Sequence, residues 1–476
     1  MSVLIVGFLI AFICYVANFY WKVSKYPRGP LPLPIIGNLH QFPAENVHLF
    51  FDDLSKIYGP CFTIWTPTPS VVLTDYEHVK EAFVNQPNMF TWRTSRPPMT
   101  FLQPHDNTGI LTADGDNWQL QRRTSLRILR DFGLGKLLME EQVMRSVNHL
   151  LDQIEDIDDK NNVDLFWKIQ LCVGNVINQT LFGFYYKYSN IQKFKNFVFI
   201  VGRHLRTIQG RLPMLISAFP WLRHLPIIGE NGYYGIKRNI ELYQKFIDEE
   251  VAKQVELFDG DSEPENFVHA YMQQMKHSAN PNLDMKNLCA SVLDFWLAGM
   301  ETTSNSLRWH IAYMMKYPEI QDKVRKEILD NVGTSRLPSM ADKPILPYTQ
   351  AVIHEVQRHS NMIPLIGYHE SVENTQVLGN KIPAGSNDSQ KFNPDRYLQT
   401  DGKKFDKAVL EKTIPFSVGK RSCLGEGLAR MELFLIFSAL IQRYEFIPNA
   451  DIDLTPNWGS VLTCKPYTCK LVKQEL

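Results

Sequence analysis

The chain has 476 residues, of which 44% are hydrophobic and 21% charged, and its 50 basic side chains balance its 50 acidic ones. So much apolar material excludes an intrinsically disordered protein, and the balanced charge argues against a nucleic-acid-binding protein. No linker-like stretch interrupts the middle of the chain, so we expect one large domain with an ample core. The seven cysteines include no Cys-x-x-Cys pair, which disfavours a disulfide framework or a four-ligand zinc site and suggests a reducing compartment.

Residues 2–21 carry no charge, and twenty residues of helix span the hydrocarbon core of a bilayer. Lys22, Lys25 and Arg28 follow, and no acidic residue precedes Glu45. This pattern predicts a single-pass signal anchor with the following domain in the cytosol; a buried N-terminal core helix is the alternative. Four prolines in 27–34 predict a stiff, extended spacer. We therefore expect an anchor over 1–21, a basic Pro-rich hinge over 22–38 and a catalytic domain over 39–476.

The rest of the chain is predicted to be mainly α with a small β portion. Apolar residues recur at helical spacing over 46–58, 76–85, 116–131, 138–155, 163–182, 190–208, 235–257, 264–275, 284–316, 318–331, 346–359 and 425–443. Strand-like runs cover 61–66, 70–74, 372–378, 381–383 and 444–447, and Gly379-Asn380 predicts a hairpin turn.

The strongest chemical signal surrounds Cys423. Gly419 and Gly425 flank this cysteine, and a helical run begins at Leu428. Flanking glycines let backbone approach the sulfur closely, and a helix N-terminus stabilises a thiolate, which can bind iron. A buried structural cysteine is the alternative interpretation.

The segment from Phe416 to Gly425 resembles the haem-binding loop of the cytochrome P-450 family, F-x-x-G-x-R-x-C-x-G. Three further segments resemble family motifs, in the family's order: Trp118–Arg122 (W-x-x-x-R), Ala298–Thr303 (the motif of the long central helix) and Glu355–Arg358 (E-x-x-R). The Pro-rich hinge after an anchor resembles the microsomal branch. The resemblance covers nearly the whole chain.

This resemblance implies the cytochrome P-450 fold, with a single large domain behind a transmembrane anchor. It implies a membrane-bound haem-thiolate monooxygenase of the endoplasmic reticulum whose catalytic domain faces the cytosol. Such an oxidoreductase inserts one oxygen atom from O2 into a lipophilic small molecule, uses haem b and receives electrons from NADPH-cytochrome P-450 reductase. No nucleic-acid partner is expected.

The resemblance also assigns residues. Cys423 becomes the axial ligand of the haem iron, and Thr302 and Glu301 serve oxygen activation. For this last pair the alternative is that Thr302 bonds back to the carbonyl four residues earlier while Glu301 faces solvent. Further haem contacts fall on Trp118, Arg122, Arg421, His369, Phe416, Gly425 and Ala298, and less securely on Arg93.

Helical spacing places Trp118 and Arg122 on one face of their helix and Arg123, Arg127 and Arg130 on another. The resemblance makes the second face, with Lys420, a docking surface for an acidic reductase, although a charge run is usually only a solvated face. Substrate contacts are expected from 97–111, 197–215 and 362–366, and from Phe295, Ala298, Thr302, Val461 and Leu462.

One segment departs from the family pattern. The resemblance implies that Arg396 joins Glu355 and Arg358 in a buried ion cluster. Between Gly385 and Lys391, however, lie the five residues 386–390, where the family has about twenty. Five residues reach at most about 18 Å, so we expect Arg396 to be displaced or a covering strand to be lost. The short segment makes a haem-poor or non-catalytic pseudoenzyme a rival function. A haem-thiolate isomerase or dehydratase that needs no reductase is a separate rival, and the Glu301-Thr302 pair and the basic face count against it.

Overall fold

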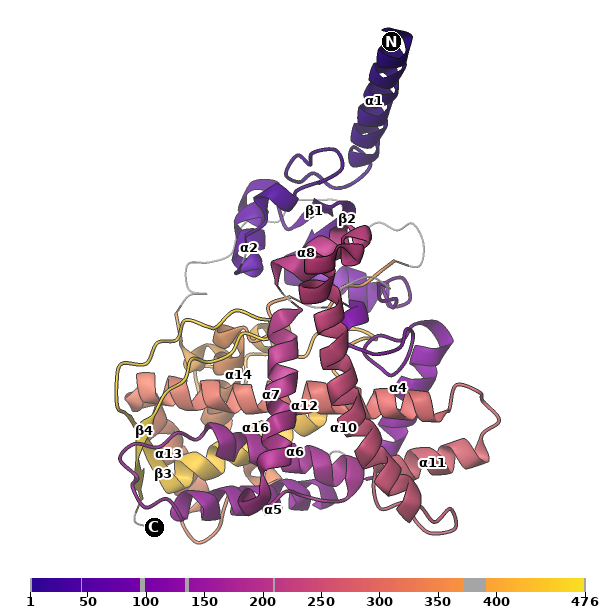
Figure 1. The fold of residues 1–476 in the computed structure, drawn as a ribbon. Helices are drawn as coiled ribbons and strands as arrows, with labels where there is room; N and C mark the ends of the chain where they lie inside the picture. Colours follow the sequence, from indigo (N-terminus) through magenta and orange to yellow (C-terminus); the bar gives the residue numbers. More distant parts are fainter. Residues whose placement is uncertain are drawn as a thin grey trace.

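A computed structural model describes residues 2–43, 45–94, 99–132, 137–208, 210–365, 367–371 and 391–474. Helices dominate these residues (Figure 1). The α-helices longer than one turn are α1 (Ser2–Val23), α2 (Val47–Tyr58), α3 (Tyr76–Lys80), α4 (Gly115–Asp131), α5 (Leu137–Glu155), α6 (Phe166–Phe182), α7 (Gln192–Thr207), α8 (Arg211–Ala218), α10 (Gly235–Leu257), α11 (Phe267–His277), α12 (Met285–Lys316), α13 (Pro318–Val332), α14 (Pro347–Ser360), α15 (Lys407–Lys412) and α16 (Glu426–Arg443).

Two antiparallel strand pairs make up the β portion of these residues. β1 (Cys61–Thr66) pairs with β2 (Thr68–Leu73), and β3 (Tyr444–Pro448) pairs with β4 (Cys469–Lys473). Every helix expected from the periodicity is present within a few residues, so the mainly α prediction is confirmed. The expected strands at 372–378 and 381–383, with their hairpin turn, lie outside the described residues.

The long helix α12 forms the centre of the fold. It packs against α6, α10, α14 and α16, and its buried residues lie on most sides of the helix. A helix buried on most sides belongs in the core of a large domain. In Figure 1, α12 runs across the molecule while α7 and α10 cross it steeply. The residues of α12 that serve the site therefore occupy the middle of the domain.

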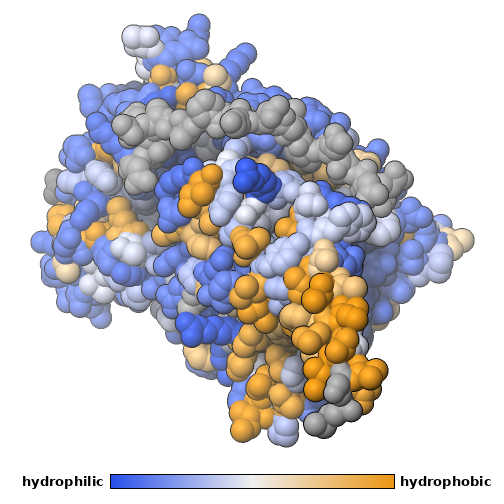
Figure 2. Space-filling view, turned by 90° about the horizontal axis from the view of Figure 1, so that it is seen from above, coloured by the Kyte–Doolittle hydropathy of each residue, from blue (hydrophilic) through white to orange (hydrophobic). Residues whose placement is uncertain are grey.

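Helix α1 projects from the domain, and its stretch Val3–Val23 is long and apolar enough to cross a membrane. Its large apolar side chains are exposed over most of its length. Figure 2, which looks down on the end from which α1 projects, shows apolar side chains gathered on one side of this face.

The Pro-rich segment after α1 is docked on the domain rather than free. A Cβ at Gly29 or Gly37 would come within 2.1 Å of backbone oxygens of β1. Asn38 fastens the segment, because its side-chain Oδ1 accepts from the Trp65 backbone N–H at 2.9 Å. Contact with β1, in addition to proline stiffness, thus holds this segment.

The ion cluster around Glu355 is closed. The fully buried Glu355 carboxylate lies 2.7 Å from Arg358 Nε and 3.1 Å from Arg396 Nε. The Asn393 backbone N–H also donates to it, at 2.6 Å. The expectation that the short segment displaces Arg396 is therefore wrong: the chain has returned to position by Lys391, whose carbonyl accepts from both arginines. Residues 386–390 themselves lie outside the described part of the chain.

Candidate active site

The loop 416–425, called the cysteine loop below, is a tight turn closed by its own backbone. The Cys423 N–H donates to the Phe416 carbonyl at 2.9 Å, and the Ser422 N–H donates to the Gly419 carbonyl at 3.1 Å. Gly419 has a φ of 80°, and a Cβ there would lie 2.1 Å from the Phe83 carbonyl oxygen. Only glycine fits this position without strain, which explains the residue four before the cysteine.

Helix α16 begins immediately after the loop, with Gly425 as its N-cap. The pKa of the Cys423 thiol is raised, first by burial and also by the Glu426 carboxylate. The backbone N–H groups of Gly425 and Glu426 and the Arg122 guanidinium oppose this rise. A Cβ added at Gly425 would meet no atom within 4 Å. Packing within the described chain therefore does not require glycine at this position. The missing side chain leaves room beside the backbone next to the sulfur.

Trp118 and Arg122, the two residues of α4 expected at the site, both lie close to the cysteine loop. Arg122 donates from Nη2 to the Ser422 carbonyl at 2.8 Å. Trp118 is buried, and the Arg421 guanidinium stacks 4.0 Å from the centroid of its ring. Helix α4 thus contacts the loop through the face that the sequence predicts.

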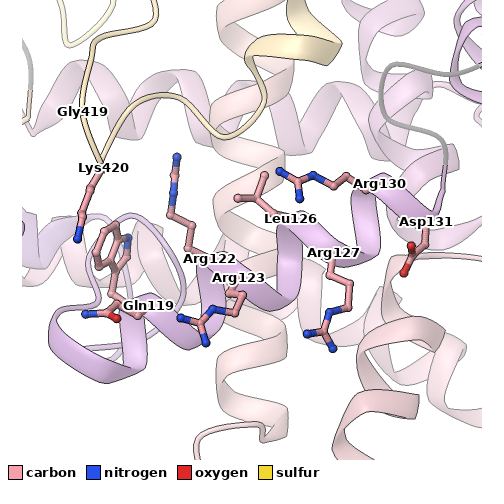
Figure 3. Close-up of a pocket in the computed structure, with 10 residues that line it drawn as sticks. Gln119, Arg122, Arg123, Leu126, Arg127, Arg130, Asp131, Gly419 and Lys420 are labelled. Carbon is pink, nitrogen blue, oxygen red and sulfur yellow. The ribbon is translucent and has the colours of Figure 1, made fainter. Parts of the chain in front are cut away.

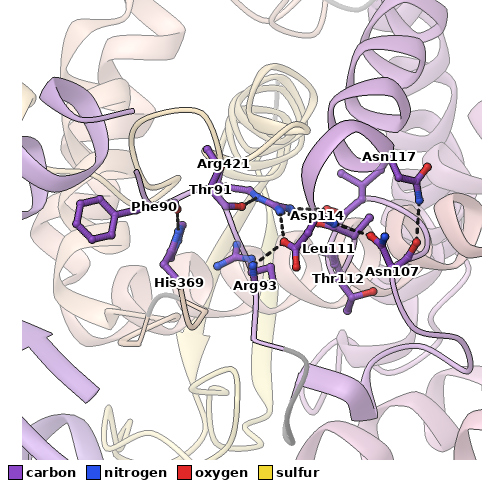
Figure 4. A network of polar contacts seen from close by, with 12 residues as sticks. Phe90, Thr91, Arg93, Asn107, Leu111, Thr112, Asp114, Asn117, His369 and Arg421 are labelled. Carbon is purple, nitrogen blue, oxygen red and sulfur yellow. Dashed lines mark hydrogen bonds and ion pairs between the residues drawn. The ribbon is translucent and has the colours of Figure 1, made fainter. Parts of the chain in front are cut away.

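Arg421, a predicted haem contact, makes four hydrogen bonds to protein groups. It donates to the carbonyls of Thr91, Ile110 and Ala113 and to the Asp114 carboxylate, at 2.6–3.1 Å (Figure 4). His369 Nδ1 contacts the Phe90 carbonyl at 2.6 Å, and burial lowers the pKa of this imidazole to about 4.

Arg421, His369 and Arg93 form a polar cluster that suits an anionic group. Arg93 donates to the carbonyls of Gly367 and Tyr368. Burial lowers the pKa of Arg93 to about 10 and that of Arg421 to about 9, and their mutual repulsion contributes to the second shift. Arg93 Nε and Trp118 Nε1 are buried without a partner among the described residues. Unpaired buried donors are costly, so carboxylates at this position would stabilise the cluster.

Helix α12 carries three further predicted site residues, Ala298, Glu301 and Thr302. Ala298 is exposed although the helix around it is buried, whereas Gly299 faces α6, where a Cβ would lie 2.7 Å from Ile177 Cδ1. Ala298 therefore leaves room beside the helix, as a contact with a flat group requires, whereas Gly299 allows two helices to pack closely.

For Thr302 the structure shows the bond expected from the alternative interpretation, whereas for Glu301 it does not show the expected exposure to solvent. Thr302 Oγ1 donates to the Ala298 carbonyl at 2.5 Å, which is the bond back along the helix. Glu301 does not face solvent: Gln170 Nε2 donates to its Oε2 at 3.2 Å, and burial raises the pKa of its carboxyl.

The sequence analysis missed Asp294 of α12. Its buried carboxylate accepts from the backbone N–H groups of Ile110 and Leu111 at 2.6 and 2.9 Å, and from the Gln103 side chain. Burial raises the pKa of Asp294 to about 7. Asp294 thereby fastens the 99–114 segment, an expected substrate contact region, to α12. An acidic residue inside an apolar helix was the available signal.

Of the expected substrate contacts, Phe101 and Leu462 are buried in packing, whereas Ile363 and Leu365 are exposed and Phe295 is partly buried. A basic groove of about 630 Å³ lies along α4 beside the cysteine loop (Figure 3). Arg123, Arg127, Arg130 and Lys420 line it and are exposed, as the helical spacing predicts. In Figure 3, Arg122 points toward the loop while Arg123 and Arg127 point away from it.

The chain matches the family model described as Cytochrome P450 over residues 27–388 and 387–471. The two matched pieces meet inside the segment that is short in this sequence. Curated relatives include Cytochrome P450 2H2 of Gallus gallus, which is 34% identical over 476 residues with 94% of each chain covered. Cytochrome P450 2J1 of Oryctolagus cuniculus is 35% identical over 469 residues, 94% of this chain and 90% of the relative. Cytochrome P450 2E1 of Rattus norvegicus is 32% identical over 491 residues, 96% of this chain and 97% of the relative.

These matches extend over nearly the whole chain, and they agree with a cysteine loop that opens α16, a helix packed against the long central helix α12. Neither the matches nor the closed Glu355 cluster supports a pseudoenzyme. The chain belongs to the cytochrome P450 family, in its microsomal branch, and is a haem-thiolate monooxygenase.

Proposed function

We propose that Cys423 is the axial ligand of haem b, and that Trp118, Arg122, Arg421, His369, Phe416, Gly425 and Ala298 surround this group. The observation that carries the proposal is the cysteine loop, where two backbone N–H groups favour a thiolate at the start of α16. Arg93 Nε and Trp118 Nε1 are buried donors suited to propionates, and Ala298 suits a flat face. Bound haem supplies the iron centre that activates O2 for insertion into a lipophilic substrate.

The carbon monoxide difference spectrum of the reduced protein tests this assignment. A red-shifted band is expected for thiolate ligation and is absent in a haem-poor pseudoenzyme. Reductase-dependent consumption of NADPH with formation of oxygenated product separates a monooxygenase from an isomerase or dehydratase, which needs no reductant.

We propose that Glu301 and Thr302 of α12 deliver protons to the reacting site. The Thr302 hydroxyl donates to Ala298 in this structure and can turn to present its proton to the reacting side. The Glu301 carboxyl is partly buried and adjacent to Thr302 in sequence, so it is suited to exchange a proton with the site.

Thr302→Ala is therefore expected to leave haem binding intact and to impair coupling. The variant should divert roughly half or more of the reducing equivalents from NADPH into hydrogen peroxide, because one positioned proton-transfer group is lost. Product and peroxide per NADPH measure the effect, with Thr302→Ser as the variant that keeps the hydroxyl. An unchanged ratio of product to NADPH in Thr302→Ala would contradict the role.

We propose the basic groove along α4 as the docking site of NADPH-cytochrome P-450 reductase. Three exposed arginines and Lys420 lie beside the cysteine loop, so an acidic partner docked here would be near the thiolate side of the haem.

Reversing the charge of Arg123, Arg127 and Arg130 together should lower reductase-driven turnover at least about tenfold at low salt and weaken its salt dependence. Turnover driven by added hydrogen peroxide should stay unchanged, because it bypasses the reductase. Charge reversal of Lys326, which is exposed on α13 and lies outside the groove, is the matched control. An equal fall with both oxidant systems would show that the arginines support the fold instead.

We further propose that α1 anchors the chain in the endoplasmic reticulum membrane, with the catalytic domain in the cytosol. The exposed apolar helix and the positive charges that follow it favour this topology. The anchor over 1–21, hinge over 22–38 and catalytic domain over 39–476 remain the proposed division. Protease protection of intact microsomes distinguishes the two orientations.

A further inference from the structure

Two side-chain hydrogen bonds join α6 to α12. Gln170 Nε2 donates to Glu301 Oε2 at 3.2 Å, and Trp296 Nε1 donates to Asn178 Oδ1 at 3.0 Å. Gln170 and Asn178 are eight residues apart, so they lie on the same side of α6. The partner of Asn178 is the indole of Trp296 in the core. The partner of Gln170 is the carboxyl of Glu301, the residue before Thr302.

Gln170 and Asn178 are equally buried amides on α6, although Gln170 donates to its partner on α12 and Asn178 accepts from its partner. Gln170 is 1% exposed and Asn178 is 0% exposed. In each amide the second polar atom, Gln170 Oε1 or Asn178 Nδ2, is buried without a partner among the described residues. Each amide therefore makes one hydrogen bond to α12. If removal of the two amides affects catalysis differently, the difference is attributed to their partners, Glu301 and Trp296.

Glu301 is surrounded by few groups that could hold it. Burial raises the pKa of its carboxyl, and the groups that lower it are Gln170 on α6, Arg308 on α12 and Arg206 on α7. Both arginines act through charge, whereas Gln170 makes a directed bond to one oxygen. Because Gly299 lets α6 approach α12 closely, Gln170 reaches this oxygen from a neighbouring helix.

We propose that Gln170 is a positioning residue for the Glu301 carboxyl, holding it in the orientation used for proton delivery. The inference rests on the proposed role of Glu301 and extends it to α6, a helix that carries none of the site residues predicted from the sequence. Without this N–H donor the carboxyl is free to rotate, and its charged form loses one hydrogen bond inside the domain.

The test uses the haem-loaded full chain with reductase and an alkoxycoumarin, such as 7-ethoxycoumarin, that the unmodified enzyme turns over. Gln170→Met keeps the side-chain volume and removes the amide. We expect product per NADPH to fall about threefold, with a matching rise in hydrogen peroxide. The carbon monoxide spectrum should be unchanged, and the acidic limb of the coupling profile should move to higher pH.

Asn178→Leu is the control, because it removes an equally buried amide between the same helices. It should keep the unmodified ratio of product to NADPH and the unmodified pH profile. Equal uncoupling by Gln170→Met and Asn178→Leu would overturn the inference, since both would then act through helix packing.

A double-mutant cycle with Glu301→Gln separates this inference from the function on which it rests. If Gln170 acts through Glu301, then Gln170→Met has no further effect in the Glu301→Gln background. Uncoupling by Glu301→Gln but not by Gln170→Met would overturn the inference alone. Normal coupling in Glu301→Gln would overturn the proposed role of Glu301 itself.

Discussion

Cys423→Ser should abolish the red-shifted carbon monoxide band of the reduced protein. A thiolate is the species that binds the iron in this family, and a serine hydroxyl stays protonated at neutral pH. The N–H groups of Gly425 and Glu426, which favour a charged sulfur, cannot ionise a hydroxyl to the same extent. The spectrum of the purified variant, together with its haem content, measures the loss.

Cys289→Ser and Cys464→Ser are the matched controls and should keep the band. Burial raises the pKa of both thiols to about 12, and Cys289 is partly buried and Cys464 buried, whereas Cys423 is exposed. Cys289 lies on α12 and Cys464 precedes β4, and neither opens a helix from a glycine-flanked loop. A band that persisted in Cys423→Ser would refute the ligand assignment.

Glu355→Ala should destabilise the domain by about 3–5 kcal/mol, because it leaves two partly buried guanidinium groups without their carboxylate. That loss is a large share of the roughly 5–15 kcal/mol that stabilises a typical domain. The same carboxylate accepts from the Asn393 N–H, so the approach of the chain to 394–397 is loosened as well. Haem per protein and the denaturant midpoint measure the effect, and Glu355→Gln gives a milder variant if Glu355→Ala does not accumulate.

Lys323→Ala is the control for this prediction. Lys323 pairs with Asp395 at 2.9 Å, next to Arg396 in sequence, but both side chains are more than half exposed. Exposed pairs contribute about 0–1 kcal/mol, so this variant should unfold close to the unmodified protein. A Glu355→Ala variant as stable as Lys323→Ala would mean that the buried cluster does not hold the segment.

The closed cluster changes the expectation for the short segment 386–390. The sequence analysis anticipated that five residues would either displace Arg396 or cost a covering strand. Displacement does not occur, because Lys391, Asn393 and Arg396 all contact the α14 pair. The loss of a strand falls on residues outside the described part of the chain.

Features that depend on local spacing were predictable from the sequence. The apolar run of α1, the helical periods and the glycines around Cys423 all follow from neighbours within a few residues. The separation of Arg122 from Arg123 and Arg127 likewise needs only the 3.6-residue turn of a helix.

Features that join distant segments were decided by the tertiary structure. The sequence offers no signal that Arg421 contacts the carbonyls of Thr91 and Ala113, or that Gln170 meets Glu301 across 131 residues. Asp294 shows why: a buried carboxylate must find donors, but which backbone N–H groups supply them depends on how the 99–114 segment crosses α12. Local periodicity sets which side of a helix is apolar, whereas the partner of each buried polar group is set by the packing of helices that are far apart in the chain.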